Sequence, residues 1–240
     1  MKQILKQLLS LLHVSVTRNQ KYDAYTKKII ARSLKTHSNC IDIGCHKGEI
    51  LDLMIKSAPL GQKFGFEPIP CLFRFLSEKY QADPSVTINA TALYDQTGKT
   101  SFQYVKNAPA YSGIKKRKYD GKNVQIEQIS VNTGLLDEII PAGFCPDLIK
   151  IDVEGAEYQV MKGSVATLSR CKPVVIFEFG LGAADFYHST PDQLYRFISL
   201  DCGMKISTLK GFLDGRPSLT LEIFRDFFEN GREYYFVAHP

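Results

Sequence analysis

The sequence lacks several features that would place it in a common class of protein. It has no repeats, and its most apolar early stretch, Ile4 to Val16, is interrupted by Lys6 and His13 and is too short to span ~30 Å of hydrocarbon. Neither sign of charge dominates, because 30 basic and 25 acidic residues leave a formal net charge of +5. This excess falls short of the basic stripe of a dedicated DNA-binding protein. We therefore expect no transmembrane segment and no DNA partner, and we consider RNA disfavoured.

Paired cysteines and a leader are also missing. The six cysteines form no C-x-x-C pair, no Cys/His spacing indicates zinc, and no signal peptide is visible before them. We expect reduced thiols in a cytoplasmic protein.

What the sequence does contain is the composition and the periodicity of an α/β protein. Its 240 residues, 44% hydrophobic and 23% charged, fit one globular domain. From residue 39 onward, short apolar runs alternate with helix-length segments, which indicates a mostly parallel sheet with helices on both faces. Strands are predicted at 40–44, 63–67, 86–89, 148–153, 174–179, 204–206 and 234–238, and helices at 49–57, 71–80, 158–168 and 191–200.

Two regions stand apart from this alternation. Residues 1–38 are predicted as an N-terminal helical segment, whose first part has leucines at helical spacing and nearby lysines. Such a helix usually covers its own domain, and the alternative is peripheral contact with a membrane or a partner. Residues 101–135, within the domain at 39–240, are predicted as a hairpin-like insertion of two exposed strands.

The first predicted βα turn favours a nucleoside-like ligand. Gly44 and Gly48 allow a tight turn between strand and helix, where free N–H groups face a ligand. The dinucleotide fingerprint G-x-G-x-x-G is incomplete because His46 stands at its second glycine, and no P-loop occurs. NAD and ATP are therefore disfavoured as ligands.

Two carboxylates flank this turn. Asp42 lies just before it and could orient a bound group. Glu67 ends the second strand, where a carboxylate can accept hydrogen bonds from both hydroxyls of a ribose. We predict Glu67 as the ribose anchor.

The strand at 148–153 carries an unusual set of charges. Alternation places Lys150, Asp152 and Glu154 on one face, although a central parallel strand is normally apolar on both faces. Either Lys150 and Asp152 form a structural ion pair, or the carboxylates point into a wet site. We favour the second interpretation and add Glu178, near the end of the next strand, as a further acid of the same cleft.

Four motifs in order resemble the FkbM family of S-adenosylmethionine-dependent methyltransferases. They are Cys40 to Gly48, Gly65 to Pro68, Asn89 to Asp95 and Ile149 to Glu157. The resemblance covers roughly residues 39 to 238. It implies a Rossmann-like seven-stranded methyltransferase sheet whose last strand is antiparallel, with S-adenosylmethionine as cofactor. It also implies O-methylation, commonly of a sugar hydroxyl or a natural product.

The resemblance also implies roles for individual residues. The methionine part of the cofactor would lie at the loop of Asp42, Gly44 and Gly48, which includes His46 in place of the asparagine that the family often has. The ribose would lie at Glu67 and Pro68, and the adenine at Ala92 and Leu93. Asp152 and Glu154 would face the reacting methyl group.

For catalysis, we predict that Asp152 is the general base or a metal ligand, supported by Glu154 and Glu178. These three carboxylates could hold Mg²⁺, although the sequence defines no coordination set. His188 is an alternative base in the loop after the fifth strand, where a solvated histidine is the more common case.

The leading functional prediction is therefore an O-methyltransferase acting on a glycan or a similar small hydroxylated acceptor. Methylation of RNA is an alternative, because the cluster Lys115 to Lys118 is basic and could equally attract an acidic glycan or a phosphorylated acceptor. A catalytically inactive protein that binds a partner is the non-enzymatic alternative.

Overall fold

The structure, a computed structural model, describes residues 17–119 and 123–240. The helix predicted over Ile4 to Val16, with its membrane or partner contact, lies outside these ranges. Within them, no helix combines the length and the hydropathy needed to cross a membrane.

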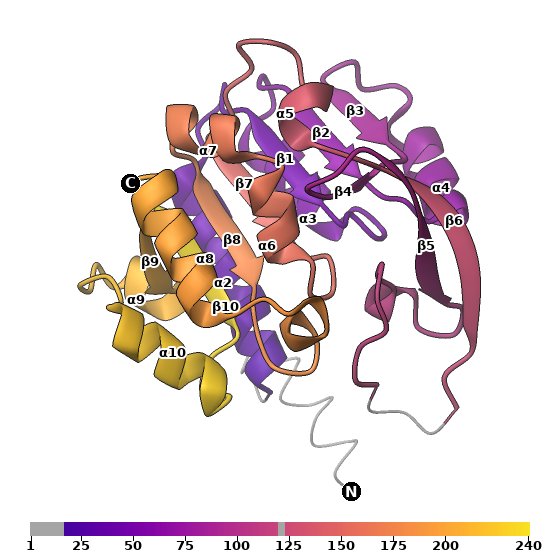
Figure 1. The fold of residues 1–240 in the computed structure, drawn as a ribbon. Coiled ribbons are helices and arrows are strands. Elements are labelled where there is room, and N and C mark those ends of the chain that lie inside the picture. Colours follow the sequence, from indigo (N-terminus) through magenta and orange to yellow (C-terminus); the bar gives the residue numbers. More distant parts are fainter. Residues whose placement is uncertain (1–16, 120–122) are drawn as a thin grey trace, which may run out of the picture.

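A seven-stranded sheet forms the centre of the molecule (Figure 1). Its strands are β1 (Cys40–Ile43), β2 (Lys63–Phe66), β3 (Val86–Asn89), β7 (Leu148–Ile151), β8 (Val174–Glu178), β9 (Lys205–Thr208) and β10 (Tyr235–His239). They are ordered β3-β2-β1-β7-β8-β10-β9, and only β10 runs antiparallel to its neighbours. β1 and β7 are buried along their whole length, as central strands of a parallel sheet are. The predicted fold class is confirmed, including the antiparallel last strand.

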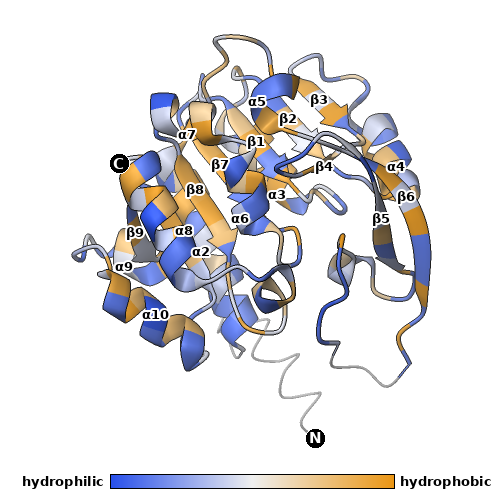
Figure 2. Cartoon of the chain, viewed as in Figure 1, coloured by the Kyte–Doolittle hydropathy of each residue, from blue (hydrophilic) through white to orange (hydrophobic). Residues whose placement is uncertain are grey.

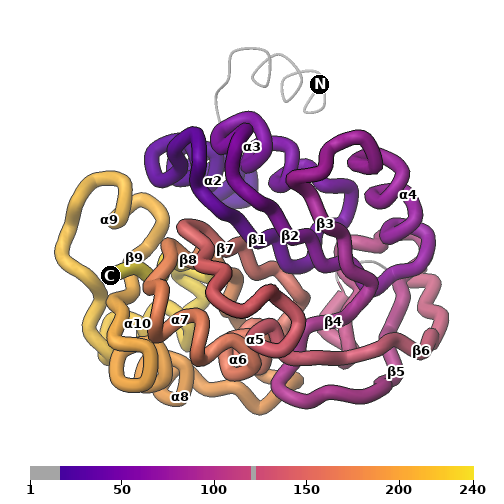
Figure 3. The backbone as a smooth tube through the Cα atoms, turned by 90° about the horizontal axis from the view of Figure 1, so that it is seen from above, coloured from indigo at the N-terminus to yellow at the C-terminus, as the bar shows by residue number. Residues whose placement is uncertain are grey.

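Helices cover both faces of this sheet (Figure 3). On one face lie α2 (Arg18–Ser33), α3 (Glu49–Ser57), α4 (Pro70–Tyr80) and α9 (Leu209–Leu213). On the other lie α5 (Leu136–Ile139), α6 (Glu157–Lys162), α7 (Val165–Cys171), α8 (Pro191–Arg196), which a π-helical turn (Phe197–Asp201) extends, and α10 (Leu221–Glu229). Strand residues alternate between the two cores: Ile41 and Ile43 pack with the second group of helices, and Cys40 packs with the first. Figure 2 shows the central strands as the hydrophobic layer.

Two predictions about helices are wrong. The helix predicted at 158–168 is split into α6 and α7, because the chain turns at Gly163, where any Cβ would come within 2.2 Å of the Tyr94 carbonyl oxygen. The connection between β9 and β10, for which the sequence analysis predicts no helix, contains α9 and α10. α10 buries Phe224 and Phe228 on one side and exposes charged residues on the other.

A second, smaller sheet extends from the central one. β5 (Gly98–Val105) and β6 (Ile126–Gly134) pair in antiparallel register, and β4 (Ala92–Leu93) lies parallel to β6. Phe102 and Val131 of this hairpin pack with Ile69 and Leu72, which follow the end of β2 and lie at the start of α4. The hairpin therefore stands over the carboxyl ends of the central strands and forms a wall beside them (Figure 1).

α2 belongs to the same hydrophobic core as the sheet. Thr17 caps its N-terminus with a capping box, and Tyr22, Ile29 and Ile30 are buried against α3, α9 and the first strands. The N-terminal turn of α2 thereby reaches the carboxyl end of the sheet, beside Tyr235.

The cysteines differ from expectation. Cys145 and Cys171 form a disulfide that joins the loop before β7 to the end of α7. The prediction that all six thiols are reduced is therefore wrong for this pair, because the fold brings their Cα atoms to 5.6 Å despite a sequence separation of 26. Cys40, Cys45, Cys71 and Cys202 are free. The cytoplasmic location stays a prediction.

Breaking this disulfide should destabilise the protein. In the chain-entropy model, a cross-link across a separation of 26 residues contributes about 3.5 kcal/mol to the free energy of unfolding. We expect a reductant to lower that free energy in urea titrations by this amount. A Cys145→Ser/Cys171→Ser double variant should already be lowered and should not respond to the reductant. Six reactive thiols in the unreduced, denatured protein, rather than four, would contradict the assignment.

Candidate functional site

Three adjoining cavities open where the carboxyl ends of β1, β2, β7 and β8 meet the hairpin and α2. The hairpin cavity lies between Glu67 and Phe102. The α2 cavity lies beside Asp42 and Lys150. The tyrosine cavity, with a volume of about 530 Å³, is the largest of the three and is lined by Tyr22, Tyr111, Tyr234 and Tyr235. Asp152, Glu154 and Ala110 line all three, so the cavities meet at these residues.

A glycine turn makes this convergence possible. Gly44, directly after β1, has φ +82°, and a Cβ there would lie 2.0 Å from the carbonyl oxygen of Asp152. Gly48, which caps α3 with φ +79°, would place a Cβ 2.4 Å from the hydroxyl of Tyr80. Only glycine allows these close approaches. Gly44 thereby lies against the end of β7, and Gly48 lies against Tyr80 of α4. His46, also in the left-handed region, lies in the same turn and lines the hairpin cavity.

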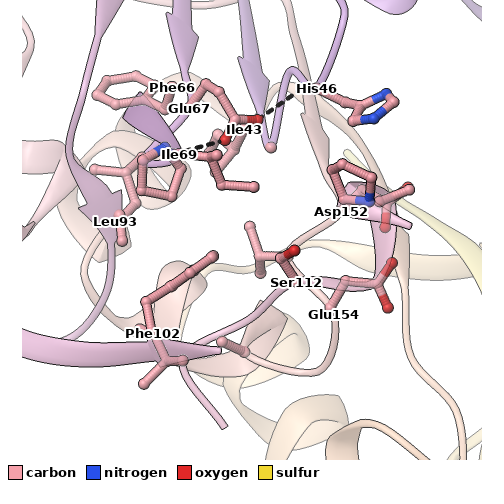
Figure 4. A pocket seen from close by; sticks show the side chains of 18 of the residues that line it. Ile43, His46, Phe66, Glu67, Ile69, Leu93, Phe102, Ser112, Asp152 and Glu154 are labelled. Carbon is pink, nitrogen blue, oxygen red and sulfur yellow. Dashed lines mark hydrogen bonds between the residues drawn. The ribbon is translucent and has the colours of Figure 1, made fainter. Parts of the chain in front are cut away.

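Glu67 lies at the polar end of the hairpin cavity (Figure 4). It is 4% exposed, and its two carboxylate oxygens accept the backbone N–H groups of His46 at 2.8 Å and Ile69 at 2.9 Å. Burial raises the pKa of Glu67 to about 7. The two bonds fix the carboxylate in place and leave acceptor positions for a ligand.

Much of the remaining wall of the hairpin cavity is apolar. Its walls come from the end of β2, from β4 and from β5, and the lining includes Phe66, Pro68, Ile69, Ala92, Leu93 and Phe102. A fixed carboxylate next to an apolar slot matches a nucleoside, which has hydroxyl groups on the sugar and an apolar face on the base. The structure thus brings Gly44, His46, Glu67, Ala92 and Leu93 together around one cavity.

Asp42 lies on the opposite side of the glycine turn. It is 2% exposed, lines the α2 cavity, and has one carboxylate oxygen, Oδ2, without a hydrogen-bond partner among the described residues. Burial raises the pKa of Asp42 to about 6. A buried acceptor without a partner is costly, so this atom is suited to accept a hydrogen bond from a bound group.

Asp152 is held by two donors. Its Oδ2 accepts the Lys150 ammonium at 2.7 Å and the Tyr235 hydroxyl at 2.6 Å. Burial alone would raise the pKa of Asp152, but the charge of Lys150 and these hydrogen bonds outweigh it, so the pKa is lowered. The ion pair that the sequence analysis considered as the alternative therefore exists, and Asp152 also lines all three cavities.

Glu154 reaches the site differently from the way that strand alternation suggested. β7 ends at Ile151, and Glu154 has φ +60°, so it lies on a turn beyond the strand. Its carboxylate forms an ion pair with Arg117. Glu157 holds this turn, because its carboxylate accepts the N–H groups of Val153 at 3.0 Å and Gly155 at 3.1 Å. Burial raises the pKa of Glu157 to about 7.

Glu178 ends β8 and lines the tyrosine cavity opposite Tyr235, its partner in the strand register. Burial, followed by the charges of Asp152 and Glu157, raises the pKa of Glu178 to about 8. Unlike Asp152, it forms no ion pair within the described residues. Its raised pKa brings the loss of its proton close to neutral pH.

His188 does not belong to the site. It is an exposed residue with φ +56° at the end of a short 3-10 helix (Ala184–Tyr187), and it lines none of the three cavities. The structure does not bring His188 to the other predicted site residues, and its role as an alternative base stays a prediction.

Most of the basic cluster at 115–118 has a structural role. Lys115 donates its ammonium to the Phe186 carbonyl at 3.0 Å, Arg117 pairs with Glu154, and the N–H of Lys118 bonds the Gly182 carbonyl at 2.9 Å. These contacts tie the hairpin loop to the segment after β8. Only the side chains of Lys116 and Lys118 remain exposed.

The predicted metal site is not supported either. Within residues 17–119 and 123–240, no group of three His, Cys, Asp or Glu residues is arranged to hold a metal ion. Lys150 and Arg117 occupy the positions beside Asp152 and Glu154 that a cation would take.

Sequence reasoning missed two contributors to the site. Tyr235 starts the last strand and Arg117 lies in the hairpin loop, and both reach the central carboxylates from distant parts of the chain. The expected strand at 234–238 could have placed Tyr235 at the carboxyl end of β8, but no local pattern indicates its hydrogen bond to Asp152.

Residues 42–206 match the family model described as Methyltransferase FkbM domain. No curated protein matches the sequence. The chain is similar to the crystal structure of Methyltransferase FkbM from Methylobacillus flagellatus KT, with a TM-score of 0.53 and 15% identity, over 86% of this chain and 44% of that chain. It thus spans less than half the length of that protein.

Two further structures have lower TM-scores. A putative O-methyltransferase from Klebsiella pneumoniae has a TM-score of 0.48 and 13% identity, with 94% of this chain and 81% of that chain covered. An rRNA methylase from Streptococcus thermophilus has a TM-score of 0.46 and 8% identity, with coverage of 93% and 96%. At these identities the likeness concerns the fold alone.

The glycine turn can be tested by substitution. Gly44→Ala adds a Cβ against a backbone carbonyl and should lower the free energy of unfolding by about 3 kcal/mol or more. Gly215→Ala is the matched control, because Gly215 also has a positive φ, of +66°, but nothing lies within 4 Å of its Cβ position. It should cost only about 1 kcal/mol of backbone strain. Equal losses in urea unfolding would show that the close approach to β7 is not a constraint.

Proposed function

Because the chain belongs to the FkbM methyltransferase family, we propose that it transfers the methyl group of S-adenosylmethionine to a hydroxyl group of a sugar or a similar small acceptor. The observation that carries the proposal is the meeting of three cavities at Asp152 and Glu154. A methyl donor and an acceptor must approach one another in line, and such a junction gives each its own cavity. The proposed catalytic domain comprises residues 39–240, with 101–135 as its insertion.

The cofactor fits the hairpin and α2 cavities. Glu67 would accept hydrogen bonds from the ribose hydroxyls, and the apolar slot at Ala92 and Leu93 would hold the adenine. The methionine part would lie at the turn of Gly44, where the free oxygen of Asp42 supplies an acceptor for its ammonium. When bound, the cofactor supplies an activated methyl group on a sulfonium.

The acceptor would occupy the tyrosine cavity, where the carboxylates have separate roles. Asp152 is kept ionised by Lys150 and Tyr235, so it orients the hydroxyl and does not compete for its proton. Glu178 takes that proton, because it lines the same cavity and has no cationic partner among the described residues. As the acceptor oxygen bonds to the methyl carbon, the proton of the hydroxyl moves to Glu178, and S-adenosylhomocysteine is released with a methyl ether.

The charge of the site supports a small acceptor over RNA. Asp23, Glu154 and Glu233 line the tyrosine cavity with Asp152, and they would repel a phosphate backbone.

Cofactor binding is the first test. We expect S-adenosylmethionine and S-adenosylhomocysteine, but not NAD, to bind with micromolar affinity in calorimetric titrations. Glu67→Ala should weaken binding by about 10- to 100-fold, since it removes hydrogen bonds to a charged acceptor. Glu78→Ala, an exposed position on α4, serves as the control and should bind normally. NAD binding as tight as that of S-adenosylmethionine would refute the assignment.

The pH dependence tests the catalytic carboxyls. A base must be deprotonated to act, and the pKa of Glu178 is raised to about 8, so methyl transfer to sugar acceptors should increase with pH up to about pH 8 and then level off. Glu178→Gln should reduce turnover by about 100-fold or more and remove this dependence. Asp152→Asn should abolish turnover while leaving cofactor affinity nearly intact.

The measurement is the transfer of labelled methyl groups to a panel of sugars at several pH values. Full activity of either variant would contradict its role, and a rate that does not change between pH 6 and 9 would argue against Glu178 as the base.

A further inference from the structure

The tyrosine cavity has a composition that goes beyond a general site for hydroxyl groups. It lies between the start of α2, the hairpin loop, the end of β8 and the start of β10. It meets the hairpin cavity at Ala110, Asp152 and Glu154, and it shares Tyr22, Asp23 and Tyr235 with the α2 cavity as well. Its cavity volume of about 530 Å³ exceeds that of either neighbouring cavity. It is therefore large enough for an acceptor of sugar size or larger.

Tyrosine rings form much of its wall, and the chain's own cations already lie over three of them. The Arg18 guanidinium lies 5.7 Å from the ring centroid of Tyr234, and that of Arg117 lies 5.4 Å from Tyr111. The Lys150 ammonium lies 5.6 Å from Tyr235. The faces of aromatic rings attract cations, so the tyrosine wall of the cavity favours a positively charged group over a negatively charged one.

The carboxylates around the cavity are only partly neutralised. Asp152 is paired with Lys150, and Glu154 with Arg117. Glu233 accepts a hydrogen bond from the neutral Tyr22 hydroxyl.

Asp23 lies on α2 beside Tyr22 and forms no hydrogen bond or ion pair that the described residues show. Burial and the charge of Glu178 raise the pKa of Tyr234 most, and the charges of Glu233 and Asp23 raise it further. Both carboxylates therefore lie near the ring of Tyr234. Against these two anions, the residues of the cavity wall that the structure describes offer one further cation, Arg18, whose guanidinium also donates to the Gly231 carbonyl at 2.8 Å.

The basic cluster of the hairpin loop does not change this balance. The Lys115 ammonium bonds the Phe186 carbonyl and lies 5.3 Å from the ring of Tyr187, outside the cavity. Neither Lys116 nor Lys118 lines the cavity. An acidic glycan or a phosphorylated acceptor would therefore meet carboxylates without a free lysine.

We propose that the acceptor is a sugar-like polyol that carries a protonated amino group, bound in the tyrosine cavity with its ammonium between Asp23 and Glu233. This proposal rests on the proposed methyl transfer and specifies its acceptor. The hydroxyl groups of the sugar ring face Asp152 and Glu178. The ammonium group contacts the carboxylates of Asp23 and Glu233 and the faces of the tyrosine rings.

The test compares three sugars that differ in charge. Protein saturated with S-adenosylhomocysteine is titrated with glucosamine, glucose and glucuronate at neutral pH and low ionic strength, and binding is followed by ligand-observed NMR. We expect glucosamine to bind about fivefold more tightly than glucose, and glucuronate to bind more weakly than both. Asp23→Asn should remove most of the amine preference. Glu222→Gln, an exposed carboxylate on α10 outside the cavity, should retain it.

The outcomes separate this proposal from the proposed function. Binding of glucuronate as tight as that of glucosamine, or no difference among the three sugars, including no binding by any, would overturn the amine preference. An unchanged preference in Asp23→Asn would overturn the placement of the ammonium. S-Adenosylhomocysteine binding is measured in the same samples, and its loss would instead contradict the methyltransferase assignment.

Discussion

The arrangement of the site depends on one buried cation. Lys150 is 5% exposed in the middle of the central strand β7, in register with Asp42 of β1. An ammonium cannot remain charged at such a position without compensation, so carboxylates must surround it. Asp152 supplies the ion pair, and Asp42 adds a second negative charge; together they raise the pKa of Lys150 despite its burial. The carboxylates that we assign to the cofactor and to the transfer step are thus the same groups that keep this lysine charged.

The same constraint separates the roles of two neighbouring acids. Lys150 and Tyr235 both bind Asp152 and keep it ionised, and the resulting negative charge contributes to the raised pKa of Glu178 on the adjacent strand. Two carboxyl groups at one strand edge therefore hold different protonation states near neutral pH. Glu67 and Asp42 are also buried acids with raised pKa values, but they lie at the cofactor cavities. The glycine at position 44 lets the turn after β1 approach the backbone of Asp152, so that the acids at the ends of β1 and β7 lie close together.

The sequence predicts the sheet and much of the site, for a physical reason. Parallel strands end at one edge, so residues that follow apolar runs, such as Asp42, Glu67 and Asp152, converge whatever the loops between them do. The contributions that sequence reasoning missed come from long-range packing. Arg117 reaches Glu154 only because the hairpin folds back, and Cys145 meets Cys171 at the end of α7. The turn at Glu154 depends on backbone N–H groups that donate to the Glu157 carboxylate. His188 shows the converse, because its position after a strand suggested a role in the site, but the residue lines none of the three cavities.

The central claim is that donor and acceptor meet at Asp152 and Glu154. A crystal structure of the complex with S-adenosylhomocysteine tests it most directly. The account predicts that the ribose hydroxyls lie within hydrogen-bond distance of the Glu67 carboxylate and the base in the slot at Leu93. It also predicts that the sulfur faces Asp152 on the side of the tyrosine cavity. A ligand bound elsewhere, or one whose sulfur points away from Asp152, would contradict the account.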